Sequence, residues 1–240
     1  MKPKRKKSQE VGEQEQSTIA EKRRQQIIAT AVALFAERGY FQTKIEDISN
    51  AIGVGKGLIY RYFKDKNDVL FCALCAVLKV YQQENVVQLM MTLGPLAALR
   101  SILEVNCAMA HEHPQEVILA YRSTKDLMPE QRHQIMLIET EIAREIEQCL
   151  RACIAAGLME PLDVKIMAYQ YIMLGHTWAL KSWALRGSYS MDNYLAEGER
   201  LLLLPYLTSA GRKKLATPLP TAKPIAKRPK EKQKKRAISK

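Results

Sequence analysis

The sequence lacks the features of membrane and exported proteins. It has no uninterrupted run of about 18 apolar residues, which is the length that spans a bilayer. Its first ten residues are charged and carry no apolar stretch of the kind that a secretory signal needs. The five cysteines are an odd number, and without an export signal a disulfide framework is not expected. We therefore expect a cytoplasmic protein with reduced thiols and no membrane partner.

Patterns for metal, cofactor or catalytic chemistry are also scarce. Cys72 and Cys75, like Cys149 and Cys153, have a spacing that any buried helix face produces. The four histidines stand without clustered carboxylates or thiols, so we expect no metal site. The string GVGKG at residues 53–57 lacks the spacing of a phosphate-binding loop. No arrangement of Ser, His and Asp indicates nucleophilic catalysis, and we expect neither an enzyme nor a bound cofactor.

Positive charge is concentrated at the two ends of the chain. The formal net charge is +12, to which residues 1–10 contribute +4 and residues 211–240 contribute +11. Between these ends, residues 17–66 hold nine Lys/Arg and five Asp/Glu, whereas residues 67–210 hold eleven and sixteen. A basic N-terminal module followed by an acidic body indicates a nucleic-acid-binding face confined to one end.

Apolar residues recur with the helical period along most of the chain, and strand-like alternation is almost absent. The expected fold class is therefore all-α. The first expected helix covers residues 17–38, where Ile27, Ala31 and Leu34 follow one face, and it stops at Gly39.

A second helix is expected after Thr43, because Thr43 and Glu46 have the T-x-x-E spacing of a capping box. It ends near Ile52, and Gly53 supplies a tight bend before a short third helix at residues 56–62. The remaining helices, which bring the total to about nine, are expected at residues 67–91, 95–112, 114–127, 130–157, 163–186 and 191–207.

Composition divides the chain into four parts. Residues 1–16 form a basic and polar arm, and residues 211–240 form a tail in which prolines alternate with lysines. Neither part can bury enough apolar surface to offset the entropy of ordering, so we expect both to be disordered. Between them lie a helix-turn-helix domain at residues 17–66 and a helical body at residues 67–210. The tail is either a non-specific DNA tether or a solubilising appendage.

The functional signal lies in the helix-turn-helix domain. Ile48 on the second helix faces the first, and Ile59 with Phe63 ties the third helix to the same small core. The other face of the third helix must then point outward. That face offers cations and hydroxyl groups suited to a major groove, at Lys56, Tyr60, Arg61 and Tyr62.

The stretches AVALFAERGYFQTKIEDIS and GVGKGLIYRYFKDK, at residues 31–49 and 53–66, resemble the N-terminal pattern of TetR-type bacterial regulators. The resemblance implies that Lys56, Gly57, Leu58 and Arg61 lie near base edges and that Thr43, Tyr60, Tyr62 and Lys66 contact phosphates. Two positions depart from the family pattern. Gly55 replaces a Ser or Thr cap, and Leu58 replaces a hydroxyl residue and suggests contact with a thymine methyl group. These departures leave the operator sequence open.

For the body, the resemblance implies a small-molecule cavity and a four-helix bundle formed with a second subunit. Independently, residues 163–186 are apolar almost all round the helix. A helix covered on one side only would not tolerate this pattern, so we expect a homodimer partner to cover the rest.

The stretch AYRSTKDLMPEQRHQIMLIE, at residues 120–139, resembles a TetR-type subgroup in which several members respond to acyl-CoA thioesters. Here Tyr121, Arg122 and Lys125 are candidates to bind an anionic head group. An apolar channel for the acyl chain would be lined by Met109, Met136, Met173, Trp178 and Trp183. The competing interpretation is ordinary core methionines and solvated charges.

The predicted function is a ligand-responsive regulator, acting as a repressor, that binds palindromic double-stranded DNA as a homodimer. A small amphipathic effector releases it, and acyl-CoA thioesters are candidates for this effector. One alternative is an efflux regulator that senses a hydrophobic or cationic drug, and another is an acyl-binding enzyme or carrier with a vestigial DNA-binding head. The effector, the operator, the regulated genes and the choice between repression and activation stay open.

Overall fold

The chain folds into helices arranged as a small head and a larger body. The computed structural model describes residues 4–79 and 86–215. Within these ranges no β-strand occurs, and only an isolated bridge joins Met159 to Leu207. The all-α class is therefore confirmed.

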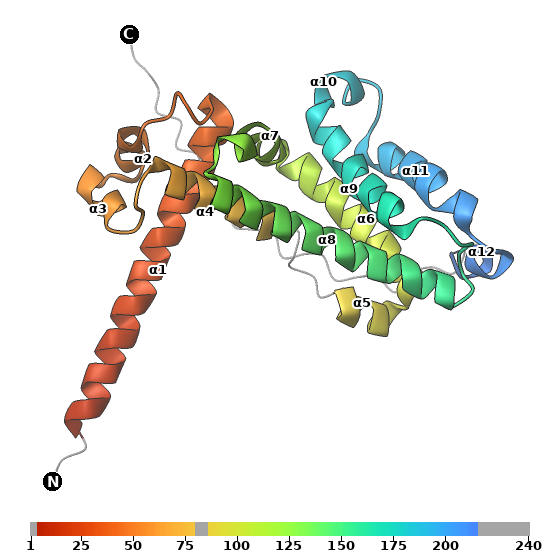
Figure 1. Ribbon diagram of the computed structural model, residues 1–240, viewed down its shortest axis with the longest axis horizontal. Coiled ribbons are helices and arrows are strands. Elements are labelled where there is room, and N and C mark those ends of the chain that lie inside the picture. Colours follow the sequence, from red (N-terminus) through yellow and green to blue (C-terminus); the bar gives the residue numbers. More distant parts are fainter. Residues whose placement is uncertain (1–3, 80–85, 216–240) are drawn as a thin grey trace.

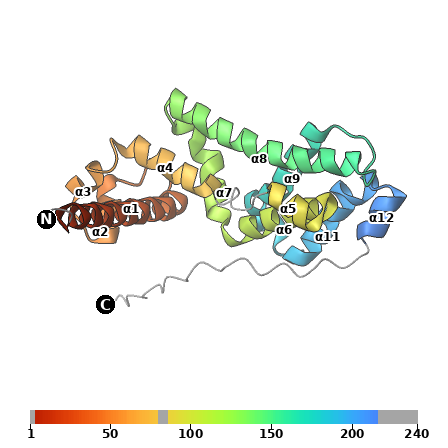
Figure 2. The same cartoon turned by 90° about the horizontal axis from the view of Figure 1, so that it is seen from below.

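The head consists of the first helices. They are α1 (Lys4–Arg38), α2 (Ile45–Ile52), α3 (Lys56–Tyr60) and α4 (Lys66–Lys79). Figures 1 and 2 both show α1, α2 and α3 at one end of the molecule, with α4 leading from them toward the body.

The body contains the remaining elements. They are α5 (Val86–Leu93), α6 (Pro95–Glu112), α7 (Pro114–Ser123), the 3-10 turn η2 (Thr124–Asp126), α8 (Pro129–Ala155), α9 (Val164–Leu180), α10 (Ser182–Leu185), α11 (Met191–Leu202), the 3-10 turn η3 (Leu204–Tyr206) and α12 (Ser209–Leu215). The helix α7 contacts α1 and α4 of the head as well as α9 of the body, so it connects the two parts.

The head is held by one apolar cluster. The predicted stripe of α1 is buried, including Ile27, Ala31 and Phe35, and so are Ile48, Ile59 and Phe63 from the elements that follow. Leu70 and Leu74 of α4 belong to the same cluster, which continues into the body through Leu119 of α7 and Ile135 of α8. Burying a large apolar side chain contributes about 1.5–3 kcal/mol, so a few such residues fix a small trihelical unit.

The body is organised around α9. This helix packs against α6, α7 and α8, and it buries Tyr171 and Trp178 completely. A Cβ atom added to Gly175 would lie 2.9 Å from the backbone oxygen of Asn106, which is closer than real contacts allow. The absence of a side chain at Gly175 therefore lets α6 and α9 approach closely.

The number of helices differs from the expected nine. The expected helix at 67–91 corresponds to α4 and α5, of which residues 80–85 lie outside the described part of the chain. The expected helix at 163–186 ends at Leu180 and is followed by α10, because Lys181 leaves the helical conformation at φ −115° and ψ 25°. The third addition is α12, which begins at Ser209 and extends into the segment predicted to be a disordered tail.

Both ends of the chain were predicted to be disordered, but the parts of them that the structure describes are helical. The helix α1 begins at Lys4 rather than near Ser17, and residues 4–16 are rich in Lys, Glu and Gln, whose straight side chains favour helices. At the other end, Gly211 in α12 is buried against the carbonyl of Leu158. The predicted tail from residue 216 onward lies outside the described residues. The domain boundaries at residues 66 and 210 stay predictions.

Candidate DNA interface and effector site

The turn between α2 and α3 sets the position of α3. Gly53 ends α2 with a φ of +70°, the left-handed conformation that favours glycine. Its N–H group donates to the carbonyl of Asn50, and the N–H of Val54 donates to that of Ser49 at 3.0 Å. These bonds close the turn within a few residues and hold α3 at a defined angle to α2.

The helix α3 has one anchored face and one free face. Ile59 and, just after the helix, Phe63 are buried in the core of the head. By contrast, Lys56, Gly57, Tyr60 and Arg61 are exposed. Figure 1 shows α3 at the outer edge of the head, away from the body. Four of the eight predicted DNA contacts therefore lie together on one accessible surface, which we call the α3 face.

Three further predicted contacts border the α3 face and are half-buried. Leu58 lies within α3, whereas Tyr62 follows it and packs against the core of the head. Lys66 begins α4, and its Nζ atom lies 4.3 Å from the centre of the Tyr40 ring and 3.4 Å from the Phe41 carbonyl oxygen. Burial lowers the pKa of Lys66. This lysine therefore supports the turn after α1 in addition to any role with phosphate.

Thr43 is the exception among the predicted contacts. Its side chain is fully buried, and its hydroxyl donates to the carbonyl oxygen of Gly39 at 2.9 Å. The capping box is also shifted by one residue from the expected Thr43–Glu46 pair: the backbone N–H of Lys44 donates to the Asp47 carboxylate at 2.7 Å. The side chain of Thr43 thus joins α1 to α2, and it is not placed to contact phosphate.

An ion pair on the α3 face was missed by sequence reasoning, which treated Glu46 as a cap. The Lys56 Nζ atom lies 2.5 Å from the Glu46 carboxylate and 5.6 Å from the centre of the Tyr60 ring. The hydrogen bond between Glu46 and Lys56 lowers the pKa of the acid and raises the pKa of the lysine. Both groups stay charged, so a phosphate or base that binds Lys56 must compete with an acidic side chain.

We predict that Glu46→Gln strengthens binding to DNA of any sequence by about three- to tenfold at low salt, because it removes a negative charge from a surface that meets phosphates. The matched control is Glu141→Gln, which removes one half of an exposed ion pair with Arg144 on α8. Fluorescence anisotropy with a labelled non-specific duplex measures the effect. Equal or weaker binding by Glu46→Gln would show that Glu46 does not oppose DNA binding.

The predicted effector residues come together only in part. The Tyr121 hydroxyl of α7 lies 2.9 Å from Nδ1 of His176 and 3.2 Å from the Met173 sulfur, both on α9. Burial lowers the pKa of His176 to about 4, so the ring is neutral at pH 7. Sequence reasoning considered His176 only as a metal ligand, and no local signal paired it with Tyr121. These three residues form a polar cluster between α7 and α9.

The other predicted effector residues are dispersed. Trp178 is fully buried, and its indole N–H donates to Nδ1 of His111 at 3.0 Å, so it serves as a core residue. Trp183 is 81% exposed on α10, Met136 is 56% exposed on α8, and Met109 is half-buried on α6. Arg122 and Lys125 are exposed. The eight residues thus differ in burial and are spread over several elements of the body, and their role in effector binding stays a prediction.

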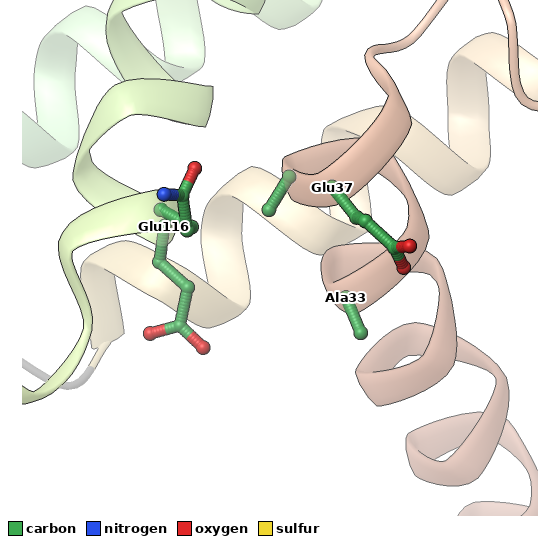
Figure 3. Close-up of a pocket in the computed structure, with 5 residues that line it drawn as sticks. Ala33, Glu37 and Glu116 are labelled. Atoms are coloured by element: carbon green, nitrogen blue, oxygen red, sulfur yellow. The ribbon is translucent and has the colours of Figure 1, made fainter.

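A pocket of about 390 Å³ lies between the head and the body (Figure 3). It is lined by Ala33, Ala36 and Glu37 of α1 and by Gln115 and Glu116 of α7. Figure 3 shows the side chains of Glu37 and Glu116 on opposite sides of this gap. Beside this pocket α1 and α7 are in contact, and Leu119 of α7 belongs to the same buried cluster as the core residues of α1.

Within residues 4–79 and 86–215, no group of three or more His, Cys, Asp or Glu side chains is arranged to hold a metal ion. In the same part of the chain, no helix is both long and apolar enough to cross a membrane.

A trihelical head with an outward recognition helix, joined to a helical body, defines the class of helix-turn-helix DNA-binding regulators. The comparisons with known proteins agree. Residues 27–72 match the family model described as "Bacterial regulatory proteins, tetR family", and residues 92–195 match the model "Tetracyclin repressor-like, C-terminal domain".

Related proteins resemble the chain over most of their length. The HTH-type transcriptional regulator HbdR of Aromatoleum sp. (strain CIB) is 39% identical over 211 residues, covering 88% of this chain and 92% of HbdR. AcrR of Shigella flexneri is 28% identical over 172 residues, covering 68% and 79%. Among solved structures, AibR in complex with isovaleryl coenzyme A and operator DNA has a TM-score of 0.64 and 21% identity, covering 77% of this chain and all of that one.

The chain belongs to the TetR family of bacterial regulatory proteins. It is a transcriptional regulator and not an enzyme.

Proposed function

We propose that this regulator is a homodimeric repressor that binds a palindromic operator through the α3 face and leaves it when a small amphipathic effector, an acyl-CoA thioester, binds the body. The observation that carries the DNA-binding part is the α3 face itself. A basic and aromatic surface, held by buried Ile59 and Phe63 on its other side, is what entry into a major groove requires.

The dimer part of the proposal is supported by α9. Ile166, Tyr169 and Met173 follow one face of this helix at i, i+3 and i+7, and they are 62%, 41% and 38% exposed. Tyr171 and Trp178 occupy the opposite, buried face. A second copy that covers the exposed face would bury these apolar groups and would complete the four-helix bundle expected from the sequence.

The effector part is supported by the resemblance of residues 120–139 to acyl-CoA-responsive regulators and by the similarity to AibR, whose structure contains isovaleryl coenzyme A. The contacts of α7 offer a route for the signal. Because α7 packs on both α9 and α1, a ligand that moves α9 or α7 also moves the head. Release requires that the effector bind the non-DNA-binding state more tightly, since only differential affinity shifts an equilibrium.

The effector is tested by displacement. The purified full-length protein is bound to labelled DNA from upstream of its own gene, and straight-chain, branched and aromatic acyl-CoA thioesters are added, with free coenzyme A as the control. Loss of binding with a thioester, but not with coenzyme A, supports the proposal. Tight DNA binding that none of the thioesters changes would refute this effector class, and thioester binding without any change in DNA affinity would instead indicate a carrier.

The basic C-terminal segment is proposed to act as a non-specific DNA tether. Residues 216–240 hold nine Lys/Arg and one Glu, and α12 ends just before them, so deletion from residue 216 leaves the described body intact. We expect the deletion to weaken binding to all duplexes by about tenfold at low salt and to flatten the salt dependence, because fewer counterions are released. Anisotropy titrations at several salt concentrations measure this. Unchanged affinity at low salt would identify a solubilising appendage instead.

A further inference from the structure

Tyr171 presents an unusual hydroxyl group in the core of the body. Its side chain is fully buried on α9, and its hydroxyl has no hydrogen-bond partner among the described residues. Other aromatic side chains of the body do have hydrogen-bond partners. Tyr194 donates to the carbonyl of Leu174 at 2.8 Å, and Trp178 donates to His111. A buried donor without a partner costs folding free energy, so such a group in a native structure calls for an explanation.

The surroundings of Tyr171 are almost entirely apolar. It belongs to the core cluster that includes Leu99 and Leu103 of α6 and Cys149 and Cys153 of α8. Thiols are weak hydrogen-bond acceptors, and the Cys149 thiol itself points to the carbonyl of Pro95 at 3.9 Å. The side chains of this cluster therefore offer the Tyr171 hydroxyl no strong hydrogen-bond acceptor.

Charged side chains beside this cluster already pair with one another. The Glu199 carboxylate of α11 accepts a hydrogen bond from Arg100 of α6, and the same arginine lies 3.6 Å from Glu104. Burial is the main cause that raises the pKa of Tyr171, with Cys153 and Glu199 adding to the effect. The phenol consequently stays protonated and can donate a hydrogen bond, and an uncharged acceptor is favoured because an anion would lose its hydration in this apolar cluster.

We propose that Tyr171 is the hydrogen-bond donor of the effector site and that it binds an uncharged acceptor, the carbonyl oxygen of an acyl thioester, whose apolar acyl group lies between α6, α8 and α9. This inference rests on the proposed function. It moves the acyl end of the site from the dispersed residues expected from the sequence to the buried cluster around Tyr171. The charged coenzyme A phosphates would stay outside this apolar cluster, because burying them there would cost their hydration.

The position of Tyr171 also explains how binding would reach the head. Tyr171 lies one helical turn before Gly175, where α9 meets the backbone of α6 at Asn106 without an intervening side chain. An acyl group inserted beside Tyr171 would push against the buried side chains of α6 and α8 that pack on α9, and so shift α9 relative to them. The helix α7 contacts α9 and α1, so this movement is passed to the head.

Two variants test the proposal in the full-length protein. Tyr171→Phe removes the unpartnered hydroxyl, and Tyr194→Phe, the matched control, removes a hydroxyl that has a partner. For each, we measure the thermal midpoint without ligand, the affinity for labelled upstream DNA, and the concentrations of isovaleryl-CoA, octanoyl-CoA and benzoyl-CoA that release half of the DNA.

For Tyr171→Phe we expect an unchanged or higher thermal midpoint, unchanged DNA affinity and a half-release concentration raised about tenfold. For Tyr194→Phe we expect a lower thermal midpoint and an unchanged half-release concentration. The proposal is overturned if Tyr171→Phe is released at the wild-type concentration, or if it loses as much thermal stability as the control, since the hydroxyl then has a structural partner. A wild-type protein that none of the three thioesters releases would instead refute the effector class, and this inference with it.

Discussion

Arg61→Ala is expected to weaken operator binding by about 100-fold or more while leaving the fold intact. Arg61 follows directly after α3, and its side chain is exposed on the α3 face. A guanidinium group that contacts a base edge contributes about 1–3 kcal/mol of discrimination. A dimer makes this contact once in each half-site, so the loss of binding free energy is doubled. The measurement is an anisotropy titration on operator DNA, with circular dichroism to verify the fold.

The control for Arg61 is Arg144→Ala. Arg144 is also exposed, but it lies on α8 and pairs with Glu141 at 3.1 Å. We expect its removal to change operator affinity by less than about twofold, because surface ion pairs contribute little. Equal losses in both variants would mean that only overall charge matters. An Arg61→Ala protein that still binds with wild-type affinity would exclude the α3 face as the reading surface.

Ile166→Glu is expected to convert the dimer into folded monomers and to reduce operator affinity by about 100-fold or more. Ile166 is 62% exposed on the α9 face proposed to meet a second copy. A carboxylate placed there loses hydration when the subunits associate. A monomer binds one half-site only and loses the gain of two linked contacts. Light scattering measures the mass, and anisotropy measures the affinity.

The control for Ile166 is Met91→Glu, because Met91 is 78% exposed on α5, a helix that packs on α6 and α8. We expect this variant to remain dimeric and to bind the operator normally. If Ile166→Glu stays dimeric, the α9 face is not the subunit interface. If Met91→Glu also becomes monomeric, the interface extends beyond α9.

The head was predictable because its signals are local. The periodic stripe of α1, the bend at Gly53 and the anchors Ile59 and Phe63 each follow from spacing within a short stretch, and the structure confirms them. The prediction that Thr43 and Glu46 form the capping box was wrong because a T-x-x-E pattern does not reveal where the helix starts. The helix begins at Ile45, one residue later than the pattern suggested, and this change turns the threonine inward.

The body was less predictable because its sites join residues far apart in the chain. The contact between Tyr121 and His176 links α7 to α9. Helical periodicity shows that residues 163–186 are apolar, but it does not show which of them face the core. As a result Trp178 and Trp183 were treated alike, although one is fully buried and the other is exposed. The unpartnered hydroxyl of Tyr171 has no signature in the sequence.

The central claim is specific DNA binding by a dimer through the α3 face. It is tested most directly by titrating the full-length protein on a duplex from upstream of its own gene and on a scrambled duplex of equal length, at low and moderate salt. The account predicts two chains per upstream duplex, binding about 1,000-fold or more tighter than to the scrambled duplex, and a preference that remains when salt weakens both. Equal affinity for the two duplexes, disappearing in parallel as salt rises, would contradict it.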